Sequence, residues 1–301
     1  MATLSAAVRL PLELFIKLVG MRVIVAKLIR MPALWVLMIS LALLTLSCRK
    51  RGTALLEQAQ TAWDNNSFDI AAARYEDYLK EDNRSVQAET ARFKLANLYL
   101  YNLKKYDLAI QHYIHLLEDF PKFSETLAAR ERLADSYKGA KDNRAAIQEL
   151  ENLLIAAPNY PDKRRIRLLI ADLYFDLNEF GQALAEYDKV TTASAFDELA
   201  QRAYLRMAGI HIIRDEFDAA LQAYQRVAGQ TGDTAIRRTA RYGMADCYER
   251  TFKFDEAVTV LQETEADPKT PDYVAKRIAA VREQQRQRQI AAPNGTLKAK
   301  R

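Results

Sequence analysis

The sequence is poor in the residues that disulfide-bonded, β-rich or disordered proteins use in quantity. Its 301 residues include 2 cysteines, 9 glycines and 8 prolines. Half of the residues are hydrophobic, and helix-favouring alanine, leucine, glutamate, lysine and arginine are plentiful. This composition argues against a β-sandwich and against a disordered chain, and it favours an all-α fold.

Signals for catalysis are also scarce. The glycines are scattered and form no phosphate-binding loop, and no nucleophile stands at a fixed spacing from a base. His112 and His115 can share a metal ion, but no cysteine or third histidine accompanies them, and with Glu118 they fit the solvated edge of a helix better. His211 fits a core position. We therefore predict a protein that is not an enzyme, with no catalytic residue, no metal and no cofactor.

Excess positive charge is confined to the two ends of the chain. Residues 1–48 contain five basic residues and one acidic residue, and residues 274–301 contain eight basic residues and one acidic residue. Residues 49–273 carry a net charge of −6. A nucleic-acid-binding protein needs its basic surface on the folded domain. The mildly acidic body therefore predicts that the protein does not bind nucleic acid.

One uncharged apolar run lies near the N-terminus. Residues 31–48 (MPALWVLMISLALLTLSC) follow Arg22, Lys27 and Arg30, and a basic segment before an apolar one is typical of a secretory signal peptide. We expect translation to start at Met21, since that start gives a more ordinary signal peptide. An uncleaved anchor is the alternative, because about 18 apolar residues just span a bilayer. Both interpretations place the following residues outside the cytoplasm, tethered to a membrane.

The end of this run, residues 44–48 (LTLSC), resembles the lipobox of bacterial lipoproteins. The resemblance implies a signal peptide over residues 1–47, a lipid on Cys48 and a short linker over residues 48–52. Arg49 follows Cys48, at the position that decides the destination membrane in the sorting rule for such lipoproteins. An arginine there favours the outer membrane, facing the periplasm. An inner-membrane anchor is the alternative. Cys247 then has no disulfide partner, and its apolar neighbours predict a small core residue.

Internal repetition is the strongest signal in the sequence. Segments such as YDLAIQHYIHLL, from Tyr106, and FDAALQAYQRV, from Phe217, share an aromatic residue, an alanine three positions later and an apolar residue four positions after that. A fixed period of this length indicates stacked helical hairpins. The anchor alanines, which are separated by 38, 37, 37, 37 and 37 residues, are Ala71, Ala109, Ala146, Ala183, Ala220 and Ala257. A second set of alanines precedes the last five anchors, at Ala96, Ala134, Ala171, Ala208 and Ala245.

This pattern resembles the tetratricopeptide repeat family over residues 53–268. The resemblance implies an all-α, right-handed α-solenoid of six hairpins, in which the alanines let helix A and helix B of each hairpin approach closely. The period of 37 exceeds the family's usual period of about 34. Beyond the repeats, Val274, Ile278 and Val281 lie at helical spacing. They predict a capping helix over residues 269–289, followed by a disordered basic tail over residues 290–301.

Members of this family bind protein partners through a concave face that helix A lines. Aromatic and arginine side chains dominate protein interfaces, so we expect Trp63, Phe93, Phe175 and Tyr242 to be the anchors. The alternative for each is packing against a neighbouring hairpin. From repeat positions 2, 5, 9 and 12, the predicted groove is Trp63, Phe93, Asn97, Leu100, Arg165, Asp172, Phe175, Arg202, Leu205, Tyr242 and Asp246, with Glu131, Asp135, Leu168, Ile212 and Glu249 beside them.

A lipidated cysteine, a short linker and five or six repeats resemble the layout of the lipoprotein subunit of the bacterial outer-membrane β-barrel assembly machinery. We therefore predict a membrane-tethered scaffold that faces the cell envelope and binds protein partners in outer-membrane protein assembly. The alternatives are a periplasmic coordinator of cell-wall synthesis or division and an accessory factor of a secretion system. The basic residues from Lys276 to Arg301 either keep the capping helix solvated or contact anionic lipid or cell-wall polymer.

Overall fold

The computed structural model describes residue 38 and residues 51–192 and 196–291. These residues divide into two compact units: the first holds the residues up to Lys105 together with Glu118–Phe120, and the second holds Tyr106–Leu117 and the residues from Pro121 onward. The predicted signal peptide apart from Met38, the predicted lipid site at Cys48, and residues 292–301 of the predicted tail lie outside the described residues. None of the described helices is long and apolar enough to cross a membrane.

The first unit begins with a helix over residues 51–64, which a short turn joins to α3 (Phe68–Glu81). This helix includes Arg51 and Gly52, so the predicted linker is wrong at those two residues. The physical reason is packing, because Gly52 is buried against the ring of Tyr78.

Next in this unit, α4 (Val86–Asn97) packs on α3 and continues into the π-helix η1 (Leu98–Leu103). The π-helix accounts for the one irregular spacing of the repeats, the 38 residues between Ala71 and Ala109. A π-helical turn holds more residues than an α-helical turn, and single π turns usually mark one inserted residue. The extra residue is therefore absorbed inside helix A rather than in a longer loop.

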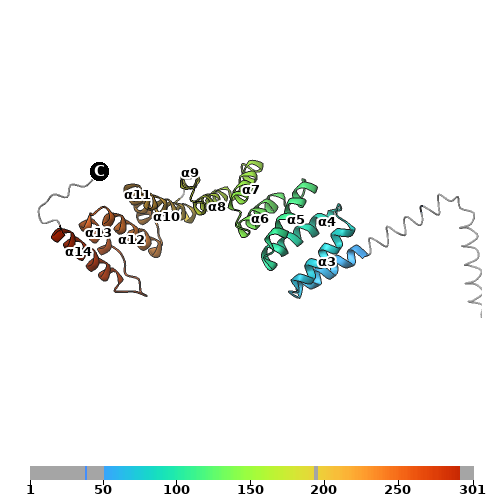
Figure 1. The fold of residues 1–301 in the computed structure, drawn as a ribbon, viewed down its shortest axis with the longest axis horizontal. Helices are drawn as coiled ribbons and strands as arrows, with labels where there is room; N and C mark the ends of the chain where they lie inside the picture. The colour runs from blue at the N-terminus through green and yellow to red at the C-terminus, as the bar shows by residue number, and fades with distance from the viewer. Residues whose placement is uncertain (1–37, 39–50, 193–195, 292–301) are drawn as a thin grey trace, which may run out of the picture. The chain divides into compact units, whose positions relative to one another are not determined.

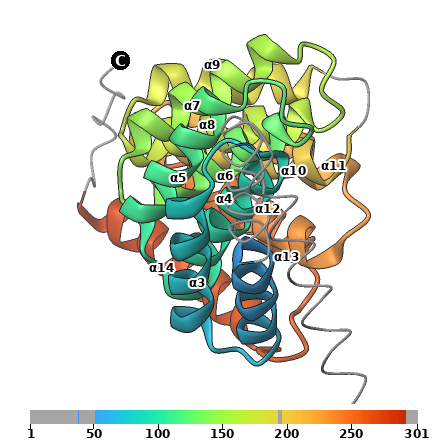
Figure 2. The same cartoon turned by 90° about the vertical axis from the view of Figure 1, so that its right-hand side faces the viewer.

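The second unit holds most of α5 (Tyr106–Asp119), four hairpins and a terminal helix, α14 (Tyr273–Ala291). The two helices of each hairpin lie side by side in both views (Figure 1 and Figure 2). The described residues contain no β-strand, and the predicted all-α repeat fold is confirmed. The hairpins are α6 (Thr126–Gly139) with α7 (Asn143–Ala156), α8 (Lys163–Asp176) with α9 (Phe180–Thr191), α10 (Glu198–Ile213) with α11 (Phe217–Gln230), and α12 (Thr234–Arg250) with α13 (Phe254–Gln262).

Each helix A ends at a residue in the left-handed backbone region. In the third repeat, Lys141 has a φ of 68°, and the N–H of Asp142 donates a 2.9 Å hydrogen bond to the carbonyl of Tyr137. This bond satisfies a carbonyl that the end of the helix would leave without a partner. The turn residues repeat with the period of the sequence, at Asn66, Lys104, Lys141, Asn178, Asp215 and Phe252.

The core of the array is built around the two sets of alanines. All of them are 2% exposed or less, as expected if they let helix axes approach closely. Larger side chains fill the space between successive hairpins; Leu150, Ile166 and Leu173 form one such cluster between α7 and α8. Cys247 is 1% exposed, so its predicted place in the core is confirmed.

The terminal helix α14 packs through one apolar stripe. Val281 is fully buried among residues of α12 and α13, and Val274 and Ile278 pack beside it. Two boundaries differ from the sequence prediction. The helix begins at Tyr273 because an isolated bridge between Asp267 and Thr270 closes a turn first, and it continues through residues 290 and 291, which we had assigned to a disordered tail.

Candidate interaction surface

The four predicted groove residues of the first unit are largely packed inside it. Phe93 and Leu100 are 7% and 4% exposed, so the expectation that they line an open groove is wrong for both. Asn97 is half-buried. Trp63 is also half-buried, and its ring lies edge-on to that of Phe68 with 6.3 Å between centroids. Packing inside the unit, the alternative interpretation, therefore describes these aromatic residues.

The predicted residues of the second unit form a ladder of ion pairs between successive A helices. Arg165 on α8 reaches back to Glu131 on α6, with 2.6 Å between Nη2 and Oε1. Arg202 on α10 reaches back to Asp172 on α8 in the same way. Each step thus joins residues about one repeat apart, and the ladder holds the A helices in register on one face.

Two further arginines extend this ladder. Arg206, one turn after Arg202, lies 3.5 Å from Asp172. Arg277 on α14 pairs with Asp246 and, at 2.7 Å, with Glu249 on α12. Sequence reasoning missed both arginines as partners, although the spacing of 31 residues between Asp246 and Arg277 is close to that of the other pairs.

The two aromatic anchors predicted in the second unit, Phe175 and Tyr242, are half-buried and packed by neighbouring side chains. Phe175 lies edge-on to Phe180, with centroids 5.7 Å apart, and the guanidinium of Arg206 lies 5.4 Å from its ring centroid. Tyr242 lies against Tyr273 of α14, with centroids 5.1 Å apart. Leu168, at 2% exposed, is a core residue, and its predicted place in the groove is wrong. Leu205 and Ile212 remain half-buried on α10.

Burial and neighbouring charges shift the pKa values of several side chains on this face. Burial raises the pKa of Asp135, and the nearby carboxylate of Glu131 raises it further. Burial also raises the pKa of Glu249, against the opposing effect of Arg277. The hydroxyl of Tyr187 on α9 is buried and donates to Asp172, and both effects raise its pKa. Asp172 and Glu249 thus belong to paired groups of the ladder, whereas the side chain of Asp135 lies near a like charge.

The ladder has one gap, between α10 and α12. Aspartate occupies one position of helix A in three repeats, at 135, 172 and 246, but the same position in the fifth repeat is Gly209. Thr239 stands on α12 where Arg165 and Arg202 stand on α8 and α10. A Cβ placed on Gly209 would meet no atom within 4 Å. Both halves of the charge pair are thus missing, and the backbone of α10 is accessible there.

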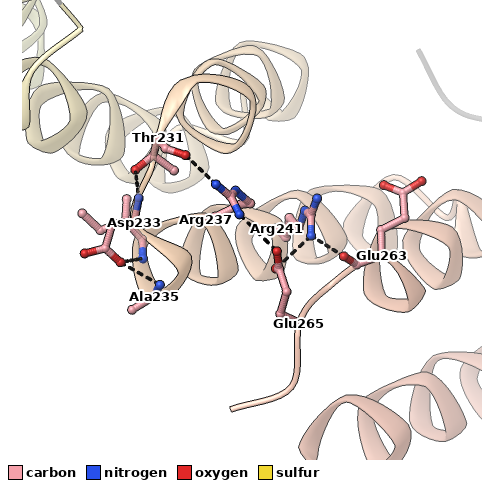
Figure 3. Close-up of polar contacts among 8 residues, drawn as sticks. Thr231, Asp233, Ala235, Arg237, Arg241, Glu263 and Glu265 are labelled. Atoms are coloured by element: carbon pink, nitrogen blue, oxygen red, sulfur yellow. Dashed lines mark hydrogen bonds and ion pairs between the residues drawn. The ribbon is translucent and has the colours of Figure 1, made fainter. Parts of the chain in front are cut away.

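The side of α12 that bears Arg237 and Arg241 carries a separate network (Figure 3). Arg237 donates to the carbonyl of Thr231 at 2.7 Å and to Glu265 at 3.1 Å. Arg241 donates to the carbonyl of Glu263 and to Glu265 at 3.0 Å. A backbone N–H and these arginines hold the pKa of Glu265 below its usual range. This network fastens the residues after α13 to α12.

The remaining candidate residues have simpler roles. His211 is not a plain core residue, because its Nδ1 lies 2.6 Å from a carboxylate oxygen of Glu216. His115 and Glu118 are exposed. Among the described residues, no group of three or more histidine, cysteine, aspartate or glutamate side chains is arranged to hold a metal ion. On α14, Arg288 stacks on the ring of Phe252 at 3.3 Å from its centroid, whereas Lys276 and Arg282 are exposed.

Comparisons with known protein families identify the same repeat. A family model described as Tetratricopeptide repeat matches residues 56–122, 131–198 and 168–235, and a second model of that description matches residues 239–270. No curated protein sequence matches the chain.

Solved structures with a similar fold include a tetratricopeptide repeat protein from Parabacteroides merdae, which is 16% identical, with 83% of this chain and 95% of that chain covered and a TM-score of 0.51. MamA is 16% identical, with coverages of 65% and 96% and a TM-score of 0.45. Yeast Tom70 is 16% identical, with coverages of 74% and 45% and a TM-score of 0.47. At this identity, the first of these supports the fold alone.

Proposed function

Because the chain belongs to the tetratricopeptide repeat family, whose helical arrays bind protein partners and are typically not catalytic, we propose that it is a non-enzymatic scaffold of the bacterial cell envelope. In this proposal it is a lipoprotein, anchored through Cys48 to the outer membrane and facing the periplasm. It binds partner proteins through the A-helix face during outer-membrane protein assembly.

The gap in the ion-pair ladder at Gly209 carries the binding part of this proposal. Elsewhere on the face, arginines of one helix pair with carboxylates of the preceding A helix, from α6 to α8, from α8 to α10 and from α12 to α14. At Gly209 no side chain covers the helix, and Leu205 lies one turn away on the same side. A partner main chain can come close at a glycine, and its side chains can then contact Leu205 and the ring of Phe175.

The anchoring part rests on the sequence. A basic segment, an apolar run and the residues LTLSC precede the repeats, and lipidation at Cys48 would leave only a few residues between the membrane and the first helix. One acyl chain gives weak membrane binding, and stable anchoring takes more than one, which is what acylation of both the thiol and the new amino group supplies.

Site-specific photocrosslinking tests the binding surface in a bacterium that has an outer membrane. A benzoylphenylalanine residue replaces Leu205 in the full chain, and the matched control carries it at exposed Gln182 on α9. We expect subunits of the β-barrel assembly machinery to be crosslinked from position 205 and not from position 182. Adding Gly209→Asp, which restores the aspartate of the neighbouring repeats, should reduce the yield from position 205.

The outcomes separate the parts of the proposal. Crosslinks from position 205 to proteins of cell-wall synthesis or of a secretion system would show that the protein acts in that pathway and not in outer-membrane protein assembly. Equal yields from positions 205 and 182, or a yield unchanged by Gly209→Asp, would show that this face is not the binding surface.

Fatty-acid labelling tests the anchor. Cells grown with an alkyne analogue of palmitate should label the wild-type chain, and Cys48→Ser should abolish the label and release the chain from the membrane fraction. Membrane association without label would mean that the apolar run remains uncleaved as the anchor.

A further inference from the structure

One position of helix A is an arginine in most repeats. It lies four residues before the helix A alanine, at Arg92, Arg130, Arg167 and Arg241. In the hairpins α6–α7 and α8–α9, this arginine pairs with a glutamate of helix B, three residues after the anchor alanine. The Nη1–Oε2 distances are 2.9 Å for Arg130 with Glu149 and 2.8 Å for Arg167 with Glu186.

The hairpin α10–α11 has neither member of this pair. Tyr204 replaces the arginine, and Ala223 replaces the glutamate. The last hairpin has Val260 at the glutamate position, but its Arg241 is held by Glu265 and by the carbonyl of Glu263 (Figure 3). Among these four hairpins, α10–α11 alone has replaced two long charged side chains by a ring and a methyl group.

The replacement leaves an open pocket of about 700 Å³ at this hairpin. Its less exposed walls are formed by Tyr204, Met207, Ala219 and Ala223 together with the imidazole of His211, while its rim is polar and exposed. Phe196 stacks on Tyr204, with centroids 5.9 Å apart and 27° between the rings, and so holds that ring in place. The lining residues on the exposed rim are Gln222, Gln225, Arg226, Gly229 and Gln230.

This pocket lies on the opposite side of α10 from the proposed groove. Successive residues of a helix are separated by about 100°, so the stripe of Tyr204, Met207 and His211, each two residues after its counterpart, points about 160° away from the stripe of Arg202, Leu205 and Gly209. The pocket therefore adds a second surface, independent of the one that would bind partners through the A-helix face.

The polar groups of the rim are free to bind. Within the part of the chain that the structure describes, Arg226 has no ion pair or hydrogen bond, and the lining contains no carboxylate. The amides of Gln222 and Gln225 likewise make no hydrogen bond to a described residue. An apolar cavity with a few convergent polar groups is the usual form of a binding site, and its one permanent charge selects a negative group.

We infer that this pocket binds a segment of a partner protein that inserts an aromatic side chain next to a carboxylate. The ring packs on Tyr204 and the thioether of Met207, since aromatic rings pair well with other rings and with sulfur. The carboxylate pairs with Arg226, and the glutamine amides bind the peptide backbone.

Fluorine NMR of a defined peptide tests this inference with the full-length chain in detergent micelles. The probe is N-acetyl-4-fluorophenylalanyl-aspartic acid amide, and the matched probe has asparagine in place of aspartic acid. We expect the fluorine line of the first probe to broaden and shift on titration, and the second to bind about fivefold more weakly, as loss of a solvent-exposed ion pair of about 1 kcal/mol implies. Empty micelles correct for partition of the peptide.

Three variants locate the binding. Tyr204→Arg with Ala223→Glu rebuilds the ion pair of the preceding hairpins and should weaken binding at least about tenfold. Arg226→Gln, an exposed change that leaves the core intact, should make the two probes bind alike. Lys138→Gln removes a charge from exposed surface on α6 and should change nothing.

The inference fails if neither probe binds above the micelle background, if both bind the filled variant as they bind the wild-type chain, or if Arg226→Gln keeps the preference for aspartic acid. Because the probe and all three variants leave Gly209 and Leu205 untouched, either result is independent of the proposed A-helix groove.

Discussion

The hydroxyl of Tyr187 on α9 donates a 2.6 Å hydrogen bond to Oδ1 of Asp172 on α8. Tyr187 is fully buried, whereas Asp172 also receives Arg202 and Arg206 from α10. This one carboxylate therefore ties helix B of its own hairpin to helix A of its own and of the next hairpin. Charge-assisted bonds of this kind are stronger than neutral ones.

Tyr187→Phe should lower the free energy of unfolding by about 1–3 kcal/mol, because it removes one hydrogen bond to a charged group while keeping the buried ring. Urea denaturation followed by circular dichroism measures the change. Tyr204→Phe is the control, since the structure gives the Tyr204 hydroxyl no hydrogen bond to a described residue. An effect of equal size in both variants would contradict the role given to the bond with Asp172.

Two glycines of helix A should respond to alanine in opposite directions. At Gly209 a Cβ meets open space, so Gly209→Ala should stabilise the chain by about 0.5–1 kcal/mol through helix propensity. At Gly243 a Cβ would clash with the ring of Tyr224, so Gly243→Ala should destabilise it by about 1–3 kcal/mol. Thermal unfolding of both variants gives the signs, and a shift in the same direction for both would refute this account of their surroundings.

Asp135 makes stability depend on pH. Burial, with a further contribution from Glu131, raises its pKa in the folded chain above the value of about 3.9 in the unfolded chain. The unfolded chain then releases its proton first, so this group's contribution to stability is full below that value and is lost as the pH rises through the folded pKa. Asp135→Asn should therefore be more stable than the wild type at neutral pH, and its advantage should disappear in acid.

The urea concentrations at the midpoint of unfolding, measured from pH 3 to pH 8 for Asp135→Asn and for the wild type, give this difference in stability. Glu131→Gln, which removes the neighbouring charge, should shift the pH range of the loss downward. Parallel pH profiles for Asp135→Asn and the wild type would mean that Asp135 titrates as an ordinary exposed carboxyl group.

Cys247 should be unreactive while the chain is folded. It is 1% exposed, and burial raises the pKa of its thiol to about 11, so very little thiolate is present at pH 8. In a Cys48→Ser background, a chromogenic disulfide reagent should react slowly with the native chain and at once with one equivalent of thiol in concentrated denaturant. Rapid reaction of the native chain would indicate that α12 opens locally.

The repeat could be predicted because its signal is local. An alanine about every 37 residues, an aromatic or turn residue three positions before it and an apolar residue after it place each helix and its buried face, and the burial of Ala71 and Ala257 follows from that periodicity. Even the insertion in the second repeat was visible as a spacing of 38, although its absorption into the π-helix η1 was not.

The candidate surface was less predictable because exposure depends on what packs opposite each side chain. The repeat positions predict that both Phe93 and Phe175 line the groove. Phe93 is buried by other residues of its own unit, whereas Phe175 stays half-buried beneath the guanidinium of Arg206. Arg165 and Arg202 were expected to face a partner, and they pair instead with carboxylates of the preceding repeat.

The sequence by itself determined the period, the hairpins and the alanine contacts, since these depend on residues a few positions apart on one helix. Only the tertiary structure decided which charges are already paired and where the surface stays open. The ladder, its gap at Gly209 and the pocket beside Tyr204 all depend on residues about 20 to 40 positions apart, which meet only when neighbouring helices pack.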